Sequence, residues 1–393
     1  MHIGLVTRGD VAYTLDLAND LYEAGMSVTL YLPYAHTVRE VGTPDRPVER
    51  LYEVGLIPRK CRVRLIRLPR MRDPRSIAVF RRLSQTMRDD GVEVAHLVVG
   101  GYELWFAVLA CLLRDVPVTS TMVQPKPEAG ERFLVIWAIN KLLTYGSDLI
   151  IVNGENQVEL VQKLYGVPAN RVTYVPLSVR TTAIRWATRT VPEEFGTILF
   201  FGRAEPHKGL KYLVQAQPFI TRQVPHARIL ISAHGKDLER CRQMIQDDSR
   251  FEIHEGFVPG AVMATFFQKA SLVVLPYLSS TTSGVLMTAY TFAKPVIATN
   301  VSGLSEYVEH GSTGLLVPPA DVEQLADAIV RLLSDDTLRH RMGENAKLWV
   351  EEWQESITQK TLRAYEKAIS IHSSSGRKAS GKARQDNTLL NRI

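Results

Sequence analysis

A short segment of glycines and cations, residues 202–209, has the residue types that bind a diphosphate. It reads Gly-Arg-Ala-Glu-Pro-His-Lys-Gly and follows the apolar run 197–201, which we expect to be a strand. Gly202 lets the backbone approach a ligand closely, Arg203 can contact phosphate with two hydrogen bonds, and Lys208 adds a point charge. The alternative is an ordinary basic loop. Because ligands of open parallel sheets bind at the carboxyl ends of strands, we favour diphosphate binding.

A second segment, residues 276–284, is rich in hydroxyl side chains and leads directly into a predicted helix. It follows the apolar run 272–275, so it also starts where a strand ends. Free amides at a helix N-terminus, together with the helix dipole, attract anions. The alternative is that Ser283 serves only as the N-cap, because serine is a favoured N-cap residue. We favour the anion site.

Two common phosphate-binding motifs are absent from the chain. The pattern Gly-x-x-x-x-Gly-Lys-Ser/Thr of the P-loop does not occur, and the turn at Gly9 lacks the Gly-x-Gly-x-x-Gly pattern of dinucleotide-binding units. The P-loop and dehydrogenase classes therefore lose their main support.

The elements that position these segments alternate between strand and helix along the chain. In the first half, the residue patterns predict strands at residues 2–7, 27–32, 94–99, 118–122 and 149–152. In the second half, they predict strands at 197–201, 228–232, 251–254, 272–275 and 296–298. The predicted helices include 303–309, 336–350 and 355–368. This alternation is typical of parallel sheets covered by helices, so we predict an α/β protein with two doubly wound, Rossmann-like domains.

We expect the two domains to be joined by a linker. Residues 1–180 form the predicted N-terminal domain, and residues 196–352 form the C-terminal one. Between them, residues 181–195 show no clean periodicity, which favours a linker. Residues 372–393 are rich in Ser, Gly, Lys and Arg, which predicts a disordered basic tail.

The positive charge of the chain is concentrated in residues 59–88, called the basic block below. This block holds eleven lysines and arginines against one acid, Asp73, whereas the whole chain has a formal net charge of only +6. Such a patch favours an anionic partner, either a lipid headgroup, a phosphate or a nucleic acid, and the alternative is a solvated face. Nucleic acid is the weakest of these partners, because the block has no aromatic residue except Phe80.

Composition excludes several further classes of protein. The chain has 393 residues, of which 45% are hydrophobic and 22% charged, and these values are typical of globular proteins. The longest apolar run, 104–113, is shorter than the roughly 20 residues that cross a bilayer. The first residues lack the pattern of a signal peptide, and the three cysteines fit neither a disulfide framework nor a zinc site. We expect a cytoplasmic protein, peripheral on the inner face of the plasma membrane if the basic block binds lipid.

Four segments in combination resemble the family 4 glycosyltransferases of the two-Rossmann (GT-B) architecture. They are residues 200–210 (FFGRAEPHKGL), 283–299 (ending KPVIAT), 303–308 (GLSEYV) and 311–317 (GSTGLLV). The resemblance implies transfer of a sugar, with retention at the anomeric carbon, from a nucleotide sugar of the UDP or GDP type. It also implies a donor held by the second domain, an acceptor in the first, and a helix at residues 353–370 that crosses back to the first domain.

The resemblance also implies roles for single residues. Arg203 and Lys208 would neutralise the donor diphosphate, the backbone amides of Ser283, Gly284 and Val285 would surround it with Gly202 nearby, and Gly9 would face it from the first domain. Fixed cations at this place stabilise the leaving group in the transition state. The chain has no Asp-x-Asp pair, which fits neutralisation of the diphosphate by side chains instead of a metal, and we expect no cofactor.

The chain departs from the family at two places. Where the family has two glutamates eight positions apart, this chain has Ser280 and Thr288. Where a His-Asp step is usual, it has Val123 and Gln124. The acceptor side is therefore assigned to the loop residues Gln124, Glu128 and Glu131, with Glu128 as the candidate catalytic carboxylate beside Arg203 and Lys208.

The main hypothesis is a retaining, metal-independent glycosyltransferase that acts on a glycan or lipid-linked acceptor at the cytoplasmic membrane face. One alternative is a degenerate subunit that keeps the fold and the diphosphate site but has lost turnover, and the missing carboxylates favour it. The other alternative is a nucleotide-sugar epimerase or hydrolase of the same fold.

Overall fold

The structure of the chain is a computed structural model that describes residues 1–68, 73, 75–99, 104–126, 133–176, 182–280 and 283–375. It divides into two compact units. Unit 1 comprises Met1–Thr37, Ile57–Pro176 and Ile357–Ile393, and unit 2 comprises Val38–Leu56 and Leu177–Ser356. Several predicted positions lie outside the described residues, namely Glu128, Glu131, Arg70, Arg72 and most of the tail, residues 376–393.

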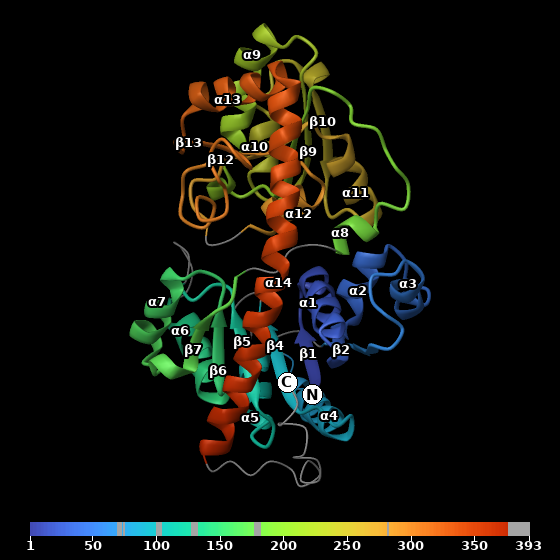
Figure 1. The fold of residues 1–393 in the computed structure, drawn as a ribbon, viewed down its shortest axis with the longest axis vertical. Helices are drawn as coiled ribbons and strands as arrows, with labels where there is room; N and C mark the ends of the chain where they lie inside the picture. Colours follow the sequence, from blue (N-terminus) through green and yellow to red (C-terminus); the bar gives the residue numbers. More distant parts are fainter. Residues whose placement is uncertain are drawn as a thin grey trace. The chain divides into compact units, whose positions relative to one another are not determined.

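Unit 1 is built on a seven-stranded parallel sheet with the order β3-β2-β1-β4-β5-β6-β7 (Figure 1). The strands are β1 (His2–Thr7), β2 (Ser27–Pro33), β3 (Arg62–Ile66), β4 (Val94–Val99), β5 (Val118–Met122), β6 (Leu149–Val152) and β7 (Val172–Tyr174). The residues of its inner strands are almost all buried, as expected for a parallel sheet with both faces covered.

Helices cover both faces of this sheet. On one face, α5 (Leu104–Leu112) packs against α4 (Ser76–Asp89) and α6 (Phe133–Gly146), and α7 (Asn156–Tyr165) lies next to α6. Because parallel crossovers are right-handed, α1 (Val11–Glu23), which leads from β1 to β2, covers the opposite face. The helix α2 (Tyr34–Val41) begins directly after β2 and starts in unit 1.

Unit 2 is built on a six-stranded parallel sheet with the order β10-β9-β8-β11-β12-β13. The strands are β8 (Thr197–Arg203), β9 (Arg228–His234), β10 (Phe251–Glu255), β11 (Leu272–Leu275), β12 (Val296–Thr299) and β13 (Gly314–Val317). The helices are α3 (Pro47–Glu53), α8 (Thr182–Arg185), α9 (Leu210–Gln223), α10 (Leu238–Arg242), α11 (Gly260–Lys269), α12 (Gly284–Thr291) and α13 (Val322–Ser334). The predicted α/β class with two doubly wound sheets is confirmed.

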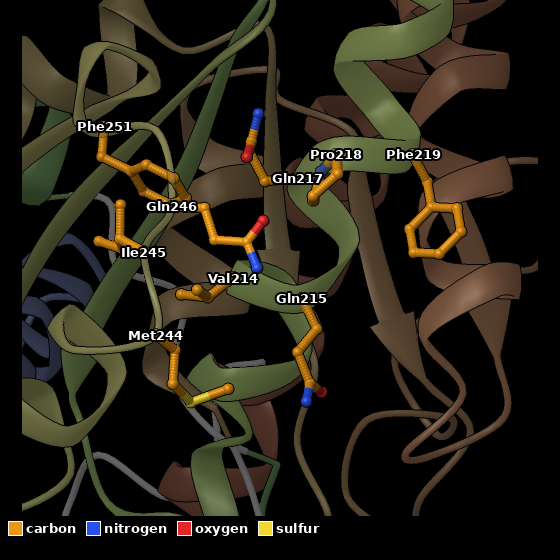
Figure 2. Close-up of a pocket in the computed structure, with 9 residues that line it drawn as sticks. All are labelled: Val214, Gln215, Gln217, Pro218, Phe219, Met244, Ile245, Gln246 and Phe251. Atoms are coloured by element: carbon orange, nitrogen blue, oxygen red, sulfur yellow. The ribbon is translucent and has the colours of Figure 1, made fainter.

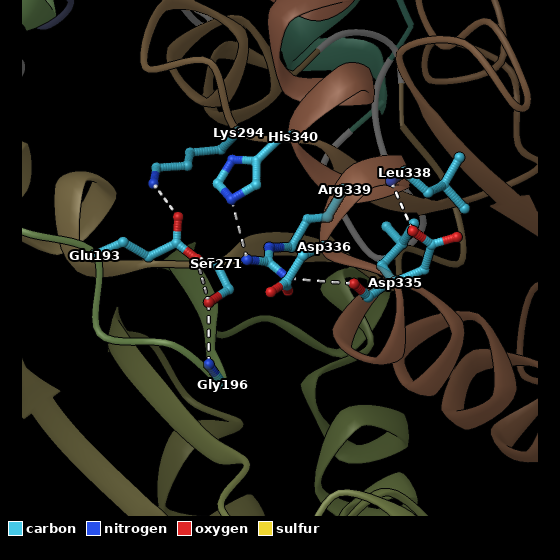
Figure 3. Close-up of polar contacts among 10 residues, drawn as sticks. Glu193, Gly196, Ser271, Lys294, Asp335, Asp336, Leu338, Arg339 and His340 are labelled. Carbon is cyan, nitrogen blue, oxygen red and sulfur yellow. Dashed lines mark hydrogen bonds and ion pairs between the residues drawn. The ribbon is translucent and has the colours of Figure 1, made fainter.

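A partly buried ion cluster ties the segment before β8 to the rest of unit 2 (Figure 3). One oxygen of Glu193 lies 3.3 Å from Nζ of Lys294, and the other lies 3.2 Å from Nη2 of Arg339. Ser271 donates a hydrogen bond of 2.8 Å to the same carboxylate and accepts the Gly196 N–H at 3.0 Å. The predicted linker therefore ends in a fixed anchor next to the first strand of the sheet.

Two predicted helices near the end of the chain are one helix in the structure. The expected helices 336–350 and 355–368 are joined in α14 (Asp336–Ser374), which Figure 1 draws as a continuous ribbon. The separation was wrong because residues 351–354, Glu-Glu-Trp-Gln, contain neither glycine nor proline and do not interrupt a helix.

The last part of α14 is anchored in unit 1 by buried polar contacts. The hydroxyl of Tyr365 lies 2.7 Å from Nδ1 of His96, whose Nε2 lies 2.7 Å from Oγ1 of Thr121. Nδ1 of His372 lies 3.0 Å from a carboxylate oxygen of Asp148. Because Ala95 and Leu97 face the α4–α7 layer, His96 between them faces the other way, and α14 shares that face with α1.

The helix expected at residues 303–309 is absent, and this segment is a series of turns. Gly303 has a φ of +81°, which lies outside the helical region. The carbonyl of Val301 accepts the amides of Leu304 and Ser305, and the carbonyl of Leu304 accepts those of Tyr307 and Val308, so the segment forms two successive turns and no continuous helix. Gly303 thus breaks the local pattern that the apolar spacing had suggested.

Candidate functional site

The two loops that follow β8 and β11 are held together at the carboxyl edge of the sheet in unit 2. The amide of Leu278 donates a hydrogen bond of 2.7 Å to the carbonyl oxygen of His207. Gly209 has a φ of +67°, and a Cβ atom at this position would collide with the carbonyl oxygen of Pro276. Only glycine fits this position, because the backbone is left-handed and the neighbouring chain is too close for a side chain.

The same two loops bring Lys208 against Tyr277. The Nζ atom of Lys208 lies 3.8 Å from the centroid of the Tyr277 ring, which is a cation–π contact. Burial raises the pKa of Tyr277 to about 12, while its hydrogen bond with Ser283 and the charge of Arg203 act in the opposite direction. Tyr277 is only 2% exposed, so its ring is a fixed surface for Lys208.

The N-terminus of α12 forms the next part of the site. Ser283 is its N-cap, and the Ser283 hydroxyl accepts the Leu286 N–H at 3.4 Å. Gly202 has a φ of +116°, and a Cβ atom there would lie 3.6 Å from Cγ2 of Val285, so the end of β8 faces the first turn of α12. Amides in a first helical turn have no partner within the helix, which leaves those of Gly284 and Val285 able to bind an anion.

The strand β9 adds polar residues that the sequence analysis did not select. Arg203 is the last residue of β8, two positions beyond the predicted strand end, and it pairs in register with His234 of β9. Arg203, His234 and Lys236 are all exposed, and Arg203 has no ion pair within the part of the chain that the structure describes. His234 and Lys236 could have been selected from the sequence, because both follow the predicted strand 228–232 closely.

Two further predicted residues are less accessible to a ligand. Thr288 is only 4% exposed, and its hydroxyl donates a hydrogen bond of 2.9 Å to the carbonyl oxygen of Gly284. It therefore keeps only its acceptor capacity. Ser280 lies half-buried in the loop after β11.

The predicted residues of the first unit lie at the carboxyl edge of its own sheet. Gly9 is exposed in the turn after β1, and a Cβ atom there would lie 3.9 Å from Nε2 of His36. Gln124 is half-buried after β5, and β4 separates its strand from β1. Glu128 and Glu131 follow Gln124 but belong to the part of the chain that the structure leaves undescribed.

A groove on unit 2 lies away from these loops. It has a volume of about 510 Å³ and is lined by residues of α9 and of the segment before β10, shown in Figure 2. The lining residues are Val214, Gln215, Gln217, Pro218, Phe219, Met244, Ile245, Gln246 and Phe251. None of the predicted anion-binding residues is among them, so this groove is separate from the candidate site.

Neither a metal centre nor a membrane-spanning helix is found in the described part of the chain. No cluster of three or more His, Cys, Asp or Glu side chains within it could hold a metal ion. No helix within it is long and apolar enough to cross a bilayer.

Comparison with known proteins matches both halves of the chain to glycosyltransferase families. Residues 8–178 match the family model "Glycosyl transferase 4-like domain", and residues 196–335 match "Glycosyl transferases group 1". With the two Rossmann-like units and the cationic sheet edge described above, these matches show that the chain belongs to the family 4 glycosyltransferases of the GT-B fold.

Individual proteins support this placement to different extents. Alpha-D-kanosaminyltransferase of Streptomyces kanamyceticus is 33% identical over 152 residues, which are 38% of this chain and 39% of that protein. D-inositol 3-phosphate glycosyltransferase of Pseudarthrobacter chlorophenolicus is 26% identical over 396 residues, which are 92% of this chain and 90% of that protein. The structure of Anabaena HepE in complex with UDP-glucose has a TM-score of 0.66 at 16% identity and covers 93% of this chain and 100% of that one, which shows a shared fold.

Proposed function

We propose that the protein is a retaining, metal-independent glycosyltransferase that moves a sugar from a nucleotide-sugar donor to a glycan or lipid-linked acceptor at the cytoplasmic membrane face. The observation that carries this proposal is the convergence of Arg203, Lys208 and the first turn of α12 around the buried Tyr277. The UDP-glucose complex of the structurally similar HepE supports a nucleotide sugar as donor.

The proposed reaction explains why cations are needed at this edge of the sheet. When the bond between the anomeric carbon and the donor phosphate breaks, negative charge develops on the nucleoside diphosphate. Arg203 and Lys208 would stabilise this charge more in the transition state than in the ground state. The amides of Gly284 and Val285 would add hydrogen bonds from the positive end of α12.

We assign retention of the anomeric configuration and independence of metal on the family resemblance and on the donor site. Two side-chain cations and a helix N-terminus supply the positive charge that a metal ion would otherwise bring to a diphosphate. Glu128, Gln124 and Glu131 remain proposed for the acceptor side, and Gly9, Gly202, Ser280 and Thr288 for the donor.

The membrane part of the proposal rests on two exposed features of one helical layer. At the start of α6, the large apolar side chains of Phe133, Leu134 and Val135 are 47%, 77% and 53% exposed. On α4, which shares a layer with α6, Arg81 and Arg82 are exposed and have no acidic partner among the described residues. Exposed apolar side chains and exposed basic side chains are both features by which proteins bind anionic bilayers.

The basic block is less charged in the folded protein than its sequence suggests. Arg62 and Arg64 both pair with Asp90, and Arg88 pairs with Asp115 at 2.6 Å. Both acids lie outside the block, so the sequence count missed them. Membrane binding is therefore assigned chiefly to Arg81 and Arg82 on α4, and not to all eleven cations.

A degenerate binding subunit is the second candidate, and Thr288 favours it. The hydroxyl proton of Thr288 is already donated to Gly284, so the position offers a weaker ligand than a carboxylate would. One experiment separates the two functions. The purified chain is incubated with UDP- and GDP-sugars in the presence of a chelator, and free nucleotide and transferred sugar are measured. Turnover supports the enzyme, whereas nucleotide binding without sugar transfer or donor hydrolysis supports the degenerate subunit.

A further inference from the structure

A basic pocket lies in unit 1, at the carboxyl edge of its sheet. It has a volume of about 290 Å³ and collects residues that follow three neighbouring strands. Arg8 follows β1, Tyr34 and His36 belong to the first turn of α2 after β2, and Arg67 follows β3. The complete lining is Arg8, Pro33, Tyr34, Ala35, His36, Ile66, Arg67 and Leu68.

The polar groups of this pocket are suited to an anion. Its lining includes two arginines and a histidine but no aspartate or glutamate. The guanidinium carbon of Arg67 lies 5.3 Å from the centroid of the Tyr34 ring, so this side chain rests on an aromatic face. The pocket also faces the first turn of α2, where amides and the helix dipole add positive potential.

The nearest acid in the sequence already has a structural role. Asp10, two residues after Arg8, is the N-cap of α1, and its carboxylate accepts the Tyr13 N–H at 3.1 Å. It does not line the pocket. The lining itself therefore carries two arginines, Arg8 and Arg67, and no carboxylate.

The remaining lining residues define a second property of the ligand. Pro33, Ala35, Ile66 and Leu68 give the pocket an apolar part beside the cations. A ligand that joins a phosphate to carbon atoms would use both parts. One guanidinium group can donate two parallel hydrogen bonds to a phosphate. A pocket with two arginines therefore suits a ligand with a phosphate better than a ligand with only a neutral hydroxyl.

We propose that this pocket binds a phosphate group of the acceptor and thereby selects phosphorylated acceptors. The inference rests on the proposed transferase function, because it treats unit 1 as the acceptor side. His36 connects the pocket to the Gly9 turn, since Nε2 of His36 lies 3.9 Å from the position of a Cβ atom on Gly9. An acceptor held by its phosphate at Arg8 and Arg67 would thus extend along the turn that follows β1.

The phosphate can belong to a soluble acceptor or to a lipid, and two probes distinguish these sources. The soluble probe is glycerol 3-phosphate, with glycerol as its neutral control. The lipid probe is a phosphatidylcholine vesicle that contains phosphatidic acid, with a pure phosphatidylcholine vesicle as its control. Binding is measured by calorimetry for the soluble probe and by co-sedimentation for the vesicles, with the full chain in every case.

Three variants make the test specific. Arg67→Gln and Arg8→Gln each remove one pocket cation, and Arg39→Gln removes an exposed cation of the same helix α2 that does not line the pocket. We expect both pocket variants to weaken binding of a phosphate probe by about tenfold or more, as for the loss of a charge-assisted hydrogen bond. Arg39→Gln should bind like the parent, and UDP binding should be unchanged in all three. Circular dichroism and melting temperature show that each variant is folded.

Each outcome is decisive. Loss of glycerol 3-phosphate binding in the pocket variants supports a soluble acceptor phosphate, and loss of vesicle binding alone supports a lipid phosphate. If the parent does not prefer either phosphate probe over its neutral control, or if the folded pocket variants bind like the parent, the proposal is overturned. Failure of UDP binding and sugar transfer with phosphate binding intact would instead overturn the proposed transferase function and leave the pocket assignment standing.

Discussion

The Nζ atom of Lys208 lies 3.8 Å from the ring centroid of Tyr277, which is almost completely buried. The contact joins the loop after β8 to the loop after β11, and Tyr277 also hydrogen-bonds with Ser283 at the start of α12. This contact restricts the flexible side chain of Lys208 before a ligand binds. Because less side-chain entropy is then lost on binding, we infer that Tyr277 is a positioning residue for Lys208.

Replacing Tyr277 should therefore weaken nucleotide binding in a graded way. Tyr277→Phe keeps the aromatic ring and loses only the hydrogen bond with Ser283, so we expect a change in UDP or GDP affinity of less than about threefold. Tyr277→Leu removes the ring and should lower affinity by about tenfold, since a desolvated cation–π contact contributes about 1–2 kcal/mol. Calorimetry measures both. Equal affinities of the folded Phe and Leu variants would show that the ring does not position Lys208.

Replacing Gly209 should destabilise the protein by a steric collision in addition to backbone strain. Gly209→Ala would collide with Pro276, whereas Gly256→Ala is a matched control, with a φ of +104° but no atom within 4 Å of the added Cβ. We expect the control to lose about 1–2 kcal/mol of unfolding free energy from the left-handed backbone alone. Gly209→Ala should lose more and should also weaken nucleotide binding, because the two loops must separate. Denaturant titration and calorimetry test this, and equal losses in the two variants would contradict it.

The ion cluster in Figure 3 predicts different effects for two neighbouring glutamates. Burial lowers the pKa of Lys294, and the charge of Glu193 opposes this shift. Glu193→Gln would remove the carboxylate that Lys294 and the buried Arg339 share, while Arg339 would keep its ion pair with Asp336, so we expect a loss of about 2 kcal/mol of unfolding free energy.

Glu194→Gln is the matched control for that change. Glu194 pairs with Arg228 and Lys269 nearer the surface, where ion pairs contribute about 1 kcal/mol or less. Urea unfolding of the two variants at neutral pH measures the difference. A loss in Glu193→Gln no larger than that in Glu194→Gln would show that the cluster does not stabilise unit 2.

The proposed membrane surface predicts salt-sensitive binding to vesicles that contain anionic lipid. Basic residues near such a surface contribute about 1 kcal/mol each, so a double change of Arg81 and Arg82 to Gln should weaken binding by about 2 kcal/mol. Leu134→Ser should weaken it further by exposing less apolar surface to the bilayer. A double change of Arg222 and Arg341 to Gln, two exposed cations of unit 2, is the charge-matched control. Co-sedimentation that is the same in every variant would argue for a solvated surface.

Sequence reasoning predicted regular elements well where apolar runs were bounded by clear breaks. The strand at 149–152 has the same limits as β6, because the polar residues Asp148 and Asn153 end its apolar run. It was wrong at 303–309, where apolar spacing suggested a helix but Gly303 has a left-handed backbone. It also split α14, since a change of the buried face along a helix looks like an end in a one-dimensional pattern.

The candidate site was also predicted only in part from the sequence. Arg203, Lys208 and Ser283 were found because they follow strands in the sequence, and the structure brings them together around Tyr277. Tyr277 was passed over because an aromatic residue next to a buried strand is usually part of the core. The pairing of Arg62, Arg64 and Arg88 with acids outside the basic block could not be predicted, since it depends on contacts between distant segments.

The central claim is that Arg203 and Lys208 bind the diphosphate of a nucleotide. The most direct test is calorimetric titration of UDP and GDP into the parent chain and into Arg203→Gln, Lys208→Gln and the control Arg240→Gln, which changes an exposed cation of α10. We predict that the parent and the control bind one of the two nucleotides equally well, and that each site variant binds it about tenfold or more weakly with unchanged unfolding free energy. Equal binding by the parent and both site variants, or no binding of either nucleotide to the parent, would contradict the account.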